Sequence, residues 1–103
     1  MKRLGLAFAF ALAASAQAFA QAGKPAEIGM GIFSFSSGPA AAYGMPGRNA
    51  AELVIEKINA DGGIGGVKIK PTFVDEGQGT DGVVAEYRRL AADAGNHAMI
   101  AAL

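Results

Sequence analysis

The feature that most restricts the fold of this chain is a short apolar run, IGMGIF, at residues 28–33. Its length suits a β-strand, and it carries no alternating polar face. A strand that is apolar on both faces is typical of a parallel sheet, because helices cover both sides of such a sheet. The run therefore predicts an α/β fold in which residues 28–33 form a central strand.

The next segment predicts an amphipathic helix that begins at Pro46, since proline suits the first helical position. Polar and apolar side chains recur at helical spacing on opposite sides of this segment. The polar side comprises Arg48, Glu52, Glu56 and Asn59, and the apolar side comprises Ala50, Ala51, Val54, Ile55 and Ile58. Glycines in ADGGIGG, residues 60–66, are expected to end the helix and turn the chain back.

Two more strands and one more helix are predicted downstream. Residues 67–75 alternate between apolar and polar, and Pro71 makes them an edge strand because proline cannot donate a ladder hydrogen bond. The loop EGQGTDG follows, in which Thr80 is expected to cap the next helix. The apolar stripe of that helix comprises Val83, Val84, Tyr87, Leu90, Ala91 and Ala94. Gly95 and Asn96 are expected to end it, and residues 98–103 are interpreted as a third, buried strand.

The resulting order, β-α-β-α-β, predicts a doubly wound parallel sheet. Right-handed crossovers place the second strand on one side of the first and the third strand on the other, which gives the order 2-1-3. A ligand in such a sheet binds at the carboxyl ends of the strands, where neighbouring crossovers leave in opposite directions. Residues 34–45 lie at that point, so they are the leading candidate for a binding site.

Three side chains in this segment suit a small polar ligand. The hydroxyls of Ser36 and Ser37, together with free backbone N–H groups, can bind polar ligand groups. Tyr43 offers a flat apolar ring with a polar tip. An alternative is that the serines only satisfy the backbone of their own loop and that Tyr43 covers the start of the helix. The residues themselves leave both readings open.

A nucleotide site is poorly supported. Gly29-x-Gly31-x-x-Ser34 weakly resembles a dinucleotide fingerprint, and Asp75 stands where an acidic residue would be expected after the second strand. The two glycines, however, lie within the first strand and not in the turn after it. No lysine-bearing phosphate loop is present either.

Catalytic and metal sites are also poorly supported. There is no G-x-S-x-G elbow, and His97 is the only histidine, so a turn or surface role is expected for it. Neighbouring residues on a strand end point apart, and the carboxylate pair Asp75-Glu76 is therefore interpreted as part of a solvated loop. We expect no catalytic residue, no metal and no cofactor, and hence no enzyme.

The N-terminus predicts export. Lys2 and Arg3 precede an apolar stretch, and AQAFAQA at residues 16–22 offers the small residues that signal peptidase requires. We expect residues 1–20 to be a signal peptide, cleaved after Ala20 or alternatively after Ala22, and residues 21–26 to be a tail. The apolar stretch is too short for a membrane span. Cysteine is absent, so neither lipidation at cysteine nor a disulfide is possible, which fits a bacterial periplasm.

Charge excludes two classes of partner. Removal of residues 1–20 takes away Lys2 and Arg3 and leaves seven basic and nine acidic residues. No basic stripe remains, so nucleic acid and anionic lipid are not expected to bind. The chain ends on the apolar sequence HAMIAAL, without a turn or a polar end. We therefore expect residues 27–103 to be the opening part of a longer protein.

Residues 27–103 as a whole resemble the opening of the type 1 periplasmic binding proteins for branched-chain amino acids and amides. The resemblance is carried by an apolar first strand and a serine-glycine-proline loop that ends in aromatic-glycine, followed by a helix with an INAxGG end. The matching residues are Ser37-Gly38-Pro39, Tyr43-Gly44, Ala51-Glu52-Leu53 and Ile58-Asn59-Ala60-Asp61-Gly62-Gly63. This chain departs from members that carry a disulfide near the end of the second strand, because it has DEGQG there. That difference leaves the ligand subclass open.

The resemblance implies a two-lobed protein that closes over a small amino acid or amide and delivers it to an ABC transporter permease. Residues 27–103 would form part of lobe 1, and Tyr43 would pack against the side chain of the ligand. The family's main contacts with the amino-acid carboxylate and ammonium come from segments beyond those present here. The alternative is an exported ligand-sensing receptor domain of the same fold, and an enzyme with a Rossmann-like sheet comes third.

Overall fold

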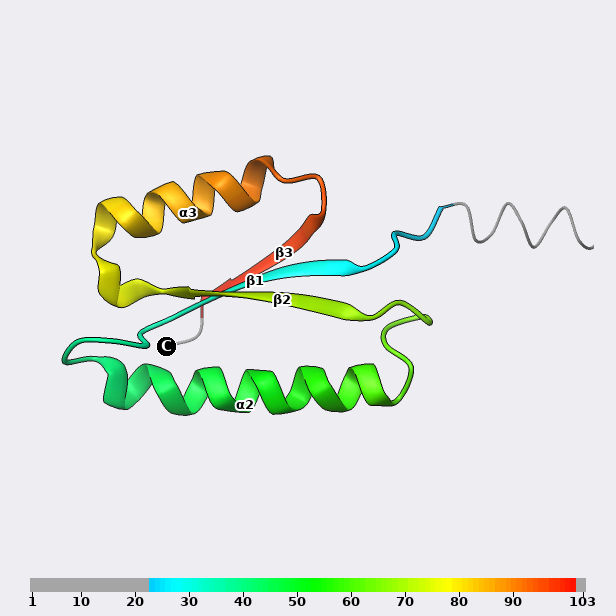
Figure 1. Cartoon of the computed structure of the whole chain (residues 1–103), viewed down its shortest axis with the longest axis horizontal. Coiled ribbons are helices and arrows are strands. Elements are labelled where there is room, and N and C mark those ends of the chain that lie inside the picture. Colours follow the sequence, from blue (N-terminus) through cyan, green and yellow to red (C-terminus); the bar gives the residue numbers. More distant parts are fainter. Residues whose placement is uncertain (1–22, 102–103) are drawn as a thin grey trace, which may run out of the picture.

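A parallel sheet lies between two helices in the computed structural model, which describes residues 23–101 (Figure 1). The strands are β1 (Ile28–Ser34), β2 (Ile69–Asp75) and β3 (Asn96–Ala101), in the order β2-β1-β3. Both pairings are parallel. The structure therefore confirms the doubly wound α/β fold with order 2-1-3. The signal peptide predicted over residues 1–20 lies outside the described residues.

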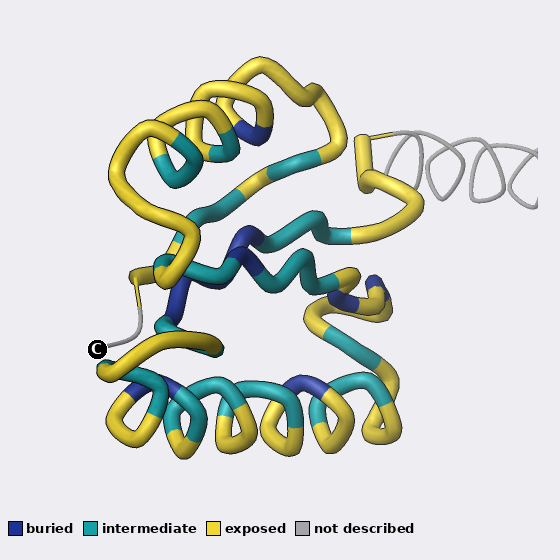
Figure 2. Tube along the Cα trace, turned by 60° about the vertical axis from the view of Figure 1, so that its left-hand side comes forward, coloured by how far each residue is buried: buried dark blue, intermediate teal, exposed yellow. Residues whose placement is uncertain are grey.

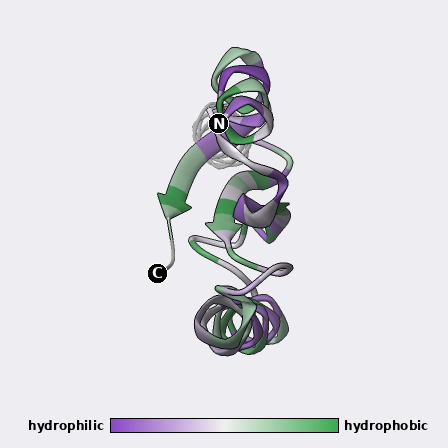
Figure 3. Ribbon diagram, turned by 90° about the vertical axis from the view of Figure 1, so that its left-hand side faces the viewer, coloured by the Kyte–Doolittle hydropathy of each residue, from purple (hydrophilic) through white to green (hydrophobic). Residues whose placement is uncertain are grey.

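The two helices cover opposite faces of the sheet (Figure 3). Helix α2 (Ala41–Ala60) connects β1 to β2, and helix α3 (Thr80–Ala92) connects β2 to β3. A short 3₁₀ helix, η1 (Glu76–Gln78), precedes α3. The two crossovers leave on opposite faces, as expected when right-handed connections run in opposite directions from β1 and β2.

The core consists of one cluster under each helix, and its buried residues lie mainly in the strands (Figure 2). On the α2 side, Ile32 and Ile69 of the sheet pack against Ile55. On the α3 side, Phe33 and Val74 pack against Leu90. Neighbouring residues of β1 thus point to opposite clusters. This explains why the sequence of β1 is apolar at nearly every position.

Helix α2 begins at Ala41, so the expectation that it starts at Pro46 is wrong. The first turn is held by contacts that a sequence pattern does not report. The Ala41 N–H donates to the Gly38 carbonyl at 3.1 Å. Gly44 is buried against the backbone of Phe35, so closely that a Cβ atom there would overlap the Phe35 carbonyl oxygen. These contacts extend the helix on the N-terminal side of the proline.

The polar and apolar sides predicted for α2 are also partly wrong. Arg48 was expected to face solvent, but its guanidinium carbon lies 4.6 Å from the ring centroid of Phe73 on β2. Asn59 is half-buried and hydrogen-bonds the backbone of β2. Val54, expected on the apolar side, is 57% exposed. The face that meets the sheet is therefore rotated toward Arg48 and Asn59.

Two further expectations are corrected. The residue that caps α3 is Gly79, with φ +96°, and not Thr80, which is the first residue of the helix. The third strand was expected to be buried, but Ile100 in β3 is 48% exposed. Within residues 23–101, β3 pairs with β1 alone, so its outer edge has no neighbouring strand to cover it.

Candidate functional site

The loop that follows β1 lies at the carboxyl ends of the strands, as the topology predicted. Residues 35–40 leave the end of β1 and lead into α2, and η1 leads from β2 into α3 at the same edge (Figure 1). The neighbouring strands β1 and β3 are the point at which the winding direction changes. This is where open α/β sheets bind ligands.

The carboxylate of Asp75 forms hydrogen bonds with both loops at the carboxyl ends of β1 and β2. Asp75 is the last residue of β2, and its Oδ1 accepts hydrogen bonds from the backbone N–H of Ser36 at 2.8 Å and of Ser37 at 3.2 Å. The same oxygen accepts from the N–H of Gly77 at 2.8 Å. The hydroxyl of Ser37 donates to Oδ2. One carboxylate thus joins the loop after β1 to the loop after β2.

These hydrogen bonds favour the ionised form of Asp75. They lower the pKa of its carboxyl group from the ordinary value of 3.8 to about 2, with the Ser37 hydroxyl as the largest cause, followed by the backbone N–H groups of Ser36 and Gly77. The side chain is therefore a carboxylate at any pH of physiological interest. The interpretation of Asp75 as part of a solvated loop is corrected in one respect: Asp75 ends β2, and its partly exposed carboxylate is held by hydrogen bonds to the loops after β1 and β2.

The structure brings Ser36 and Ser37 together, but it uses them differently. Ser36 is half-buried and bonds Asp75 through its backbone, which leaves its hydroxyl out of that contact. Ser37 is exposed and commits its hydroxyl hydrogen to Asp75, so that its oxygen can still accept a hydrogen bond. Gly77 lies close to Ser37: an added Cβ would lie 2.6 Å from the Ser37 carbonyl oxygen. The Ser36-Ser37 segment is thus fixed on two sides.

Tyr43 lies in the first turn of α2, just beyond this loop. Its side chain is 81% exposed, more than any other large hydrophobic residue among those described. The backbone N–H of Tyr43 donates to Ala40 at 3.0 Å, so the turn that carries the side chain is ordered. The chain's other tyrosine, Tyr87, is less exposed, at 53%, and its ring centroid lies 6.3 Å from that of the buried Phe33. Tyr43 therefore contributes little to the core.

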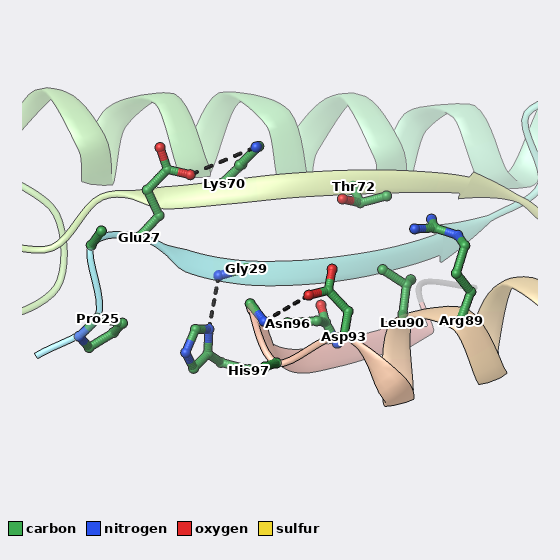
Figure 4. A pocket seen from close by; sticks show the side chains of 13 residues that line it. Pro25, Glu27, Gly29, Lys70, Thr72, Arg89, Leu90, Asp93, Asn96 and His97 are labelled. Atoms are coloured by element: carbon green, nitrogen blue, oxygen red, sulfur yellow. Dashed lines mark hydrogen bonds and ion pairs between the residues drawn. The ribbon is translucent and has the colours of Figure 1, made fainter.

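A polar groove of about 590 Å³ lies at the amino ends of the strands, opposite the loop after β1 (Figure 4). Its cations are already paired: the ammonium of Lys70 lies 4.0 Å from the carboxylate of Glu27, and Arg89 bonds Glu86 at 2.8 Å. That pairing raises the pKa of Arg89 above its ordinary value.

The glycines that weakly resembled a nucleotide fingerprint have a packing role. A Cβ at Gly29 would overlap the carbonyl oxygen of Gly95, and one at Gly31 would lie 2.8 Å from the Leu90 Cδ1. The two glycines therefore let α3 and the turn after it approach the sheet. His97 is exposed, as expected for a surface role, but it lies in β3 and not in a turn; its Nδ1 accepts the N–H of Gly29 at 3.1 Å where the β1–β3 register shifts.

Asp75 is the site residue that the sequence did not identify. Its partners Ser36 and Ser37 lie 39 and 38 positions away, so no local spacing connects them. One signal was available in the predicted topology. Ser34 and Asp75 end neighbouring parallel strands and are register partners, so the residue after each strand lies at one edge. An acidic residue there is within reach of the loop from β1.

The described residues contain neither a cluster of metal-ligating side chains nor a membrane-spanning helix. Residues 23–101 contain no group of three or more His, Asp or Glu side chains arranged to hold a metal ion. In the same residues, no helix has both the length and the apolar character needed to cross a membrane.

Comparison with protein families identifies the fold. Residues 27–103 match the model of a family described as periplasmic binding protein. The chain belongs to this family. Comparison with individually curated proteins gives no match. Membership of the periplasmic binding proteins, which are generally non-enzymatic, agrees with the expectation of a binding function and with the export predicted from the N-terminus.

Proposed function

We propose that this chain forms the first part of lobe 1 of a periplasmic substrate-binding protein, which captures a small amino acid or amide and delivers it to an ABC transporter permease. Ser36, Ser37 and Tyr43 line the ligand side of this lobe. The family match supports a small-molecule binding role. The ligand class and the permease are inferred from the sequence resemblance described above.

The observation that carries the proposal is the exposure of Tyr43 at the carboxyl edge of the sheet. An aromatic side chain that is 81% exposed has kept its apolar area available for another molecule. It follows directly on a loop with an available serine hydroxyl and an ordered backbone. An apolar surface beside a few fixed polar groups is the composition of a small-molecule site.

The test is Tyr43→Ala in the full-length binding protein. The ligand is first identified by thermal-shift screening against amino acids, amides and urea, and its affinity is then measured by calorimetry. We expect the substitution to weaken binding by ~1–3 kcal/mol, the range for loss of a well-packed aromatic anchor. The melting temperature without ligand should change little, because the ring packs against little of the core.

Tyr87→Ala is the matched control, since it removes the same side chain from α3, where the ring contacts Phe33. This variant should lose stability and keep its affinity. The opposite pattern, in which Tyr43→Ala lowers the melting temperature and leaves affinity intact, would show that Tyr43 only covers the start of α2.

A further inference from the structure

We propose that Asp75 is a positioning residue for the ligand loop, residues 35–40. Its carboxylate fixes the shape in which this loop presents Ser36, Ser37 and, on the following turn, Tyr43, and it does not contact the ligand itself. The ligand-related part of this inference rests on the function proposed above.

The end of the strand ladder explains why the loop needs an outside support. The β1–β2 pairing ends at Ser34 and Asp75, so the residues after Ser34 have no ladder partner in β2. The next peptide groups bond the Asp75 side chain instead, through the N–H of Ser36 and of Ser37. Backbone hydrogen bonds connect β1 to β2 as far as Ser34. Beyond Ser34, the side chain of Asp75 makes the connection. Unpaired backbone N–H groups would otherwise need water as their partner.

The distribution of bonds on Asp75 favours positioning over direct ligand contact. Oδ1 accepts three backbone N–H groups, and Oδ2 accepts the Ser37 hydroxyl. Oδ2 keeps one acceptor position, and at Oδ1 a ligand ammonium would have to displace charge-assisted bonds, which are among the stronger ones in the protein. The low pKa of the carboxyl group is consistent with these bonds being kept. Most of the acceptor capacity of the carboxylate is thus taken by the protein's own donors.

The same carboxylate also ties the loop to the segment between β2 and α3. Gly77 donates to the oxygen that binds Ser36 and Ser37, and its backbone lies against Ser37. A displacement of η1 would therefore move Ser37 as well. This gives two ways to disturb the loop: removal of the charge at Asp75, and addition of a methyl group at Gly77, which would crowd Ser37 and lie 3.0 Å from the Asp75 Oδ1 without removing the charge.

The first experiment measures amide hydrogen exchange in the full-length protein carrying Asp75→Asn. We expect exchange at Ser36 and Ser37 to become at least about tenfold faster, because their charge-assisted bonds are weakened. Asp93→Asn is the matched control. Asp93 Oδ1 accepts from Gly95 two residues ahead at 2.8 Å, the same local bond as Asp75 with Gly77, but at the opposite edge of the sheet. The control should leave Ser36 and Ser37 unchanged, and unchanged exchange in Asp75→Asn would overturn the proposal.

The second experiment uses calorimetry to measure affinity in Asp75→Asn and in Gly77→Ala, with the amino acid or amide that gives the largest shift in the thermal-shift screen. Gly77→Ala crowds Ser37 but keeps the Asp75 charge. Positioning predicts that both variants bind about tenfold more weakly, since a loop that is no longer preorganised must be ordered on binding. A loss confined to Asp75→Asn would indicate direct contact with the ligand ammonium and would overturn the proposal.

These outcomes separate the two hypotheses. If the wild-type protein does not bind any compound of the screen, the proposed function fails, whereas the exchange rates at Ser36 and Ser37 still decide whether Asp75 holds the loop. If Asp75→Asn does not fold, Ser37→Ala takes its place in the exchange experiment. It removes only the hydroxyl bond to Oδ2 and should still speed amide exchange at Ser36 and at the substituted position 37.

Discussion

Substitution of Asn59 by alanine should remove the hydrogen bonds that connect the C-terminal end of α2 to the first residue of β2. The side-chain Nδ2 of Asn59 donates to the Ile69 carbonyl at 2.8 Å, and its Oδ1 accepts the Ile69 N–H at 2.8 Å. Ile69 is the first residue of β2, and within residues 23–101 β2 pairs with β1 alone. The asparagine amide therefore satisfies both the N–H and the C=O of Ile69, which point away from β1. Alanine leaves both groups without this partner.

The size of the effect follows from these two bonds. Each contributes about 1 kcal/mol net to stability, so their loss costs about 2 kcal/mol. Alanine also has a higher helix propensity than asparagine, which returns up to about 0.7 kcal/mol. We expect Asn59→Ala to lower the free energy of unfolding by about 1–2 kcal/mol. Asn49→Ala is the matched control, because Asn49 is an exposed asparagine on the same helix, and this variant should be neutral or slightly stabilised.

Two measurements test this reasoning in the full-length protein. Urea unfolding should separate the two variants by about 2 kcal/mol, since the helix-propensity gain is common to both and cancels in the difference. Amide exchange at Ile69 should become faster in Asn59→Ala and stay unchanged in Asn49→Ala. Equal stabilities for the two variants, with Ile69 still protected, would refute the assigned role of Asn59.

Two other predictions follow from the structure. Because the pKa of Asp75 is about 2 in the folded protein and 3.8 ordinarily, its contribution to stability should be complete above about pH 4 and should be lost as the pH falls toward 2. The stability difference between wild type and Asp75→Asn, measured by urea unfolding from pH 6 to pH 2, should shrink over that interval; a constant difference would contradict the assignment. Gly29→Ala should destabilise more than Gly31→Ala, since the first meets the backbone carbonyl of Gly95 and the second meets the movable side chain of Leu90. Gly31→Ala should cost about 1–3 kcal/mol by overpacking, and equal losses in thermal unfolding would argue against this packing.

Local spacing determined most of the secondary structure. The apolar run at residues 28–33, the alternation through residues 67–75 and the helical periodicities each depend on residues a few positions apart, and all of these elements are present. Pro71 correctly indicated that β2 has a free edge. The handedness of crossovers then determined the order of the strands, and with it the position of residues 35–40 at the carboxyl ends of the strands. These properties depend on local sequence and on the handedness of connections, and not on particular tertiary contacts.

The tertiary structure alone decided how the polar groups pair. Asp75, Arg48 and Asn59 have the composition of exposed residues, and the sequence predicted them to be solvated. In the fold, the neighbouring elements supply partners: the loop after β1 for Asp75, the ring of Phe73 for Arg48, and the backbone N–H and C=O of Ile69 for Asn59. Periodicity reports how often a residue type recurs, but a hydrogen bond depends on which donor lies within about 3 Å, and that is set only when distant segments meet.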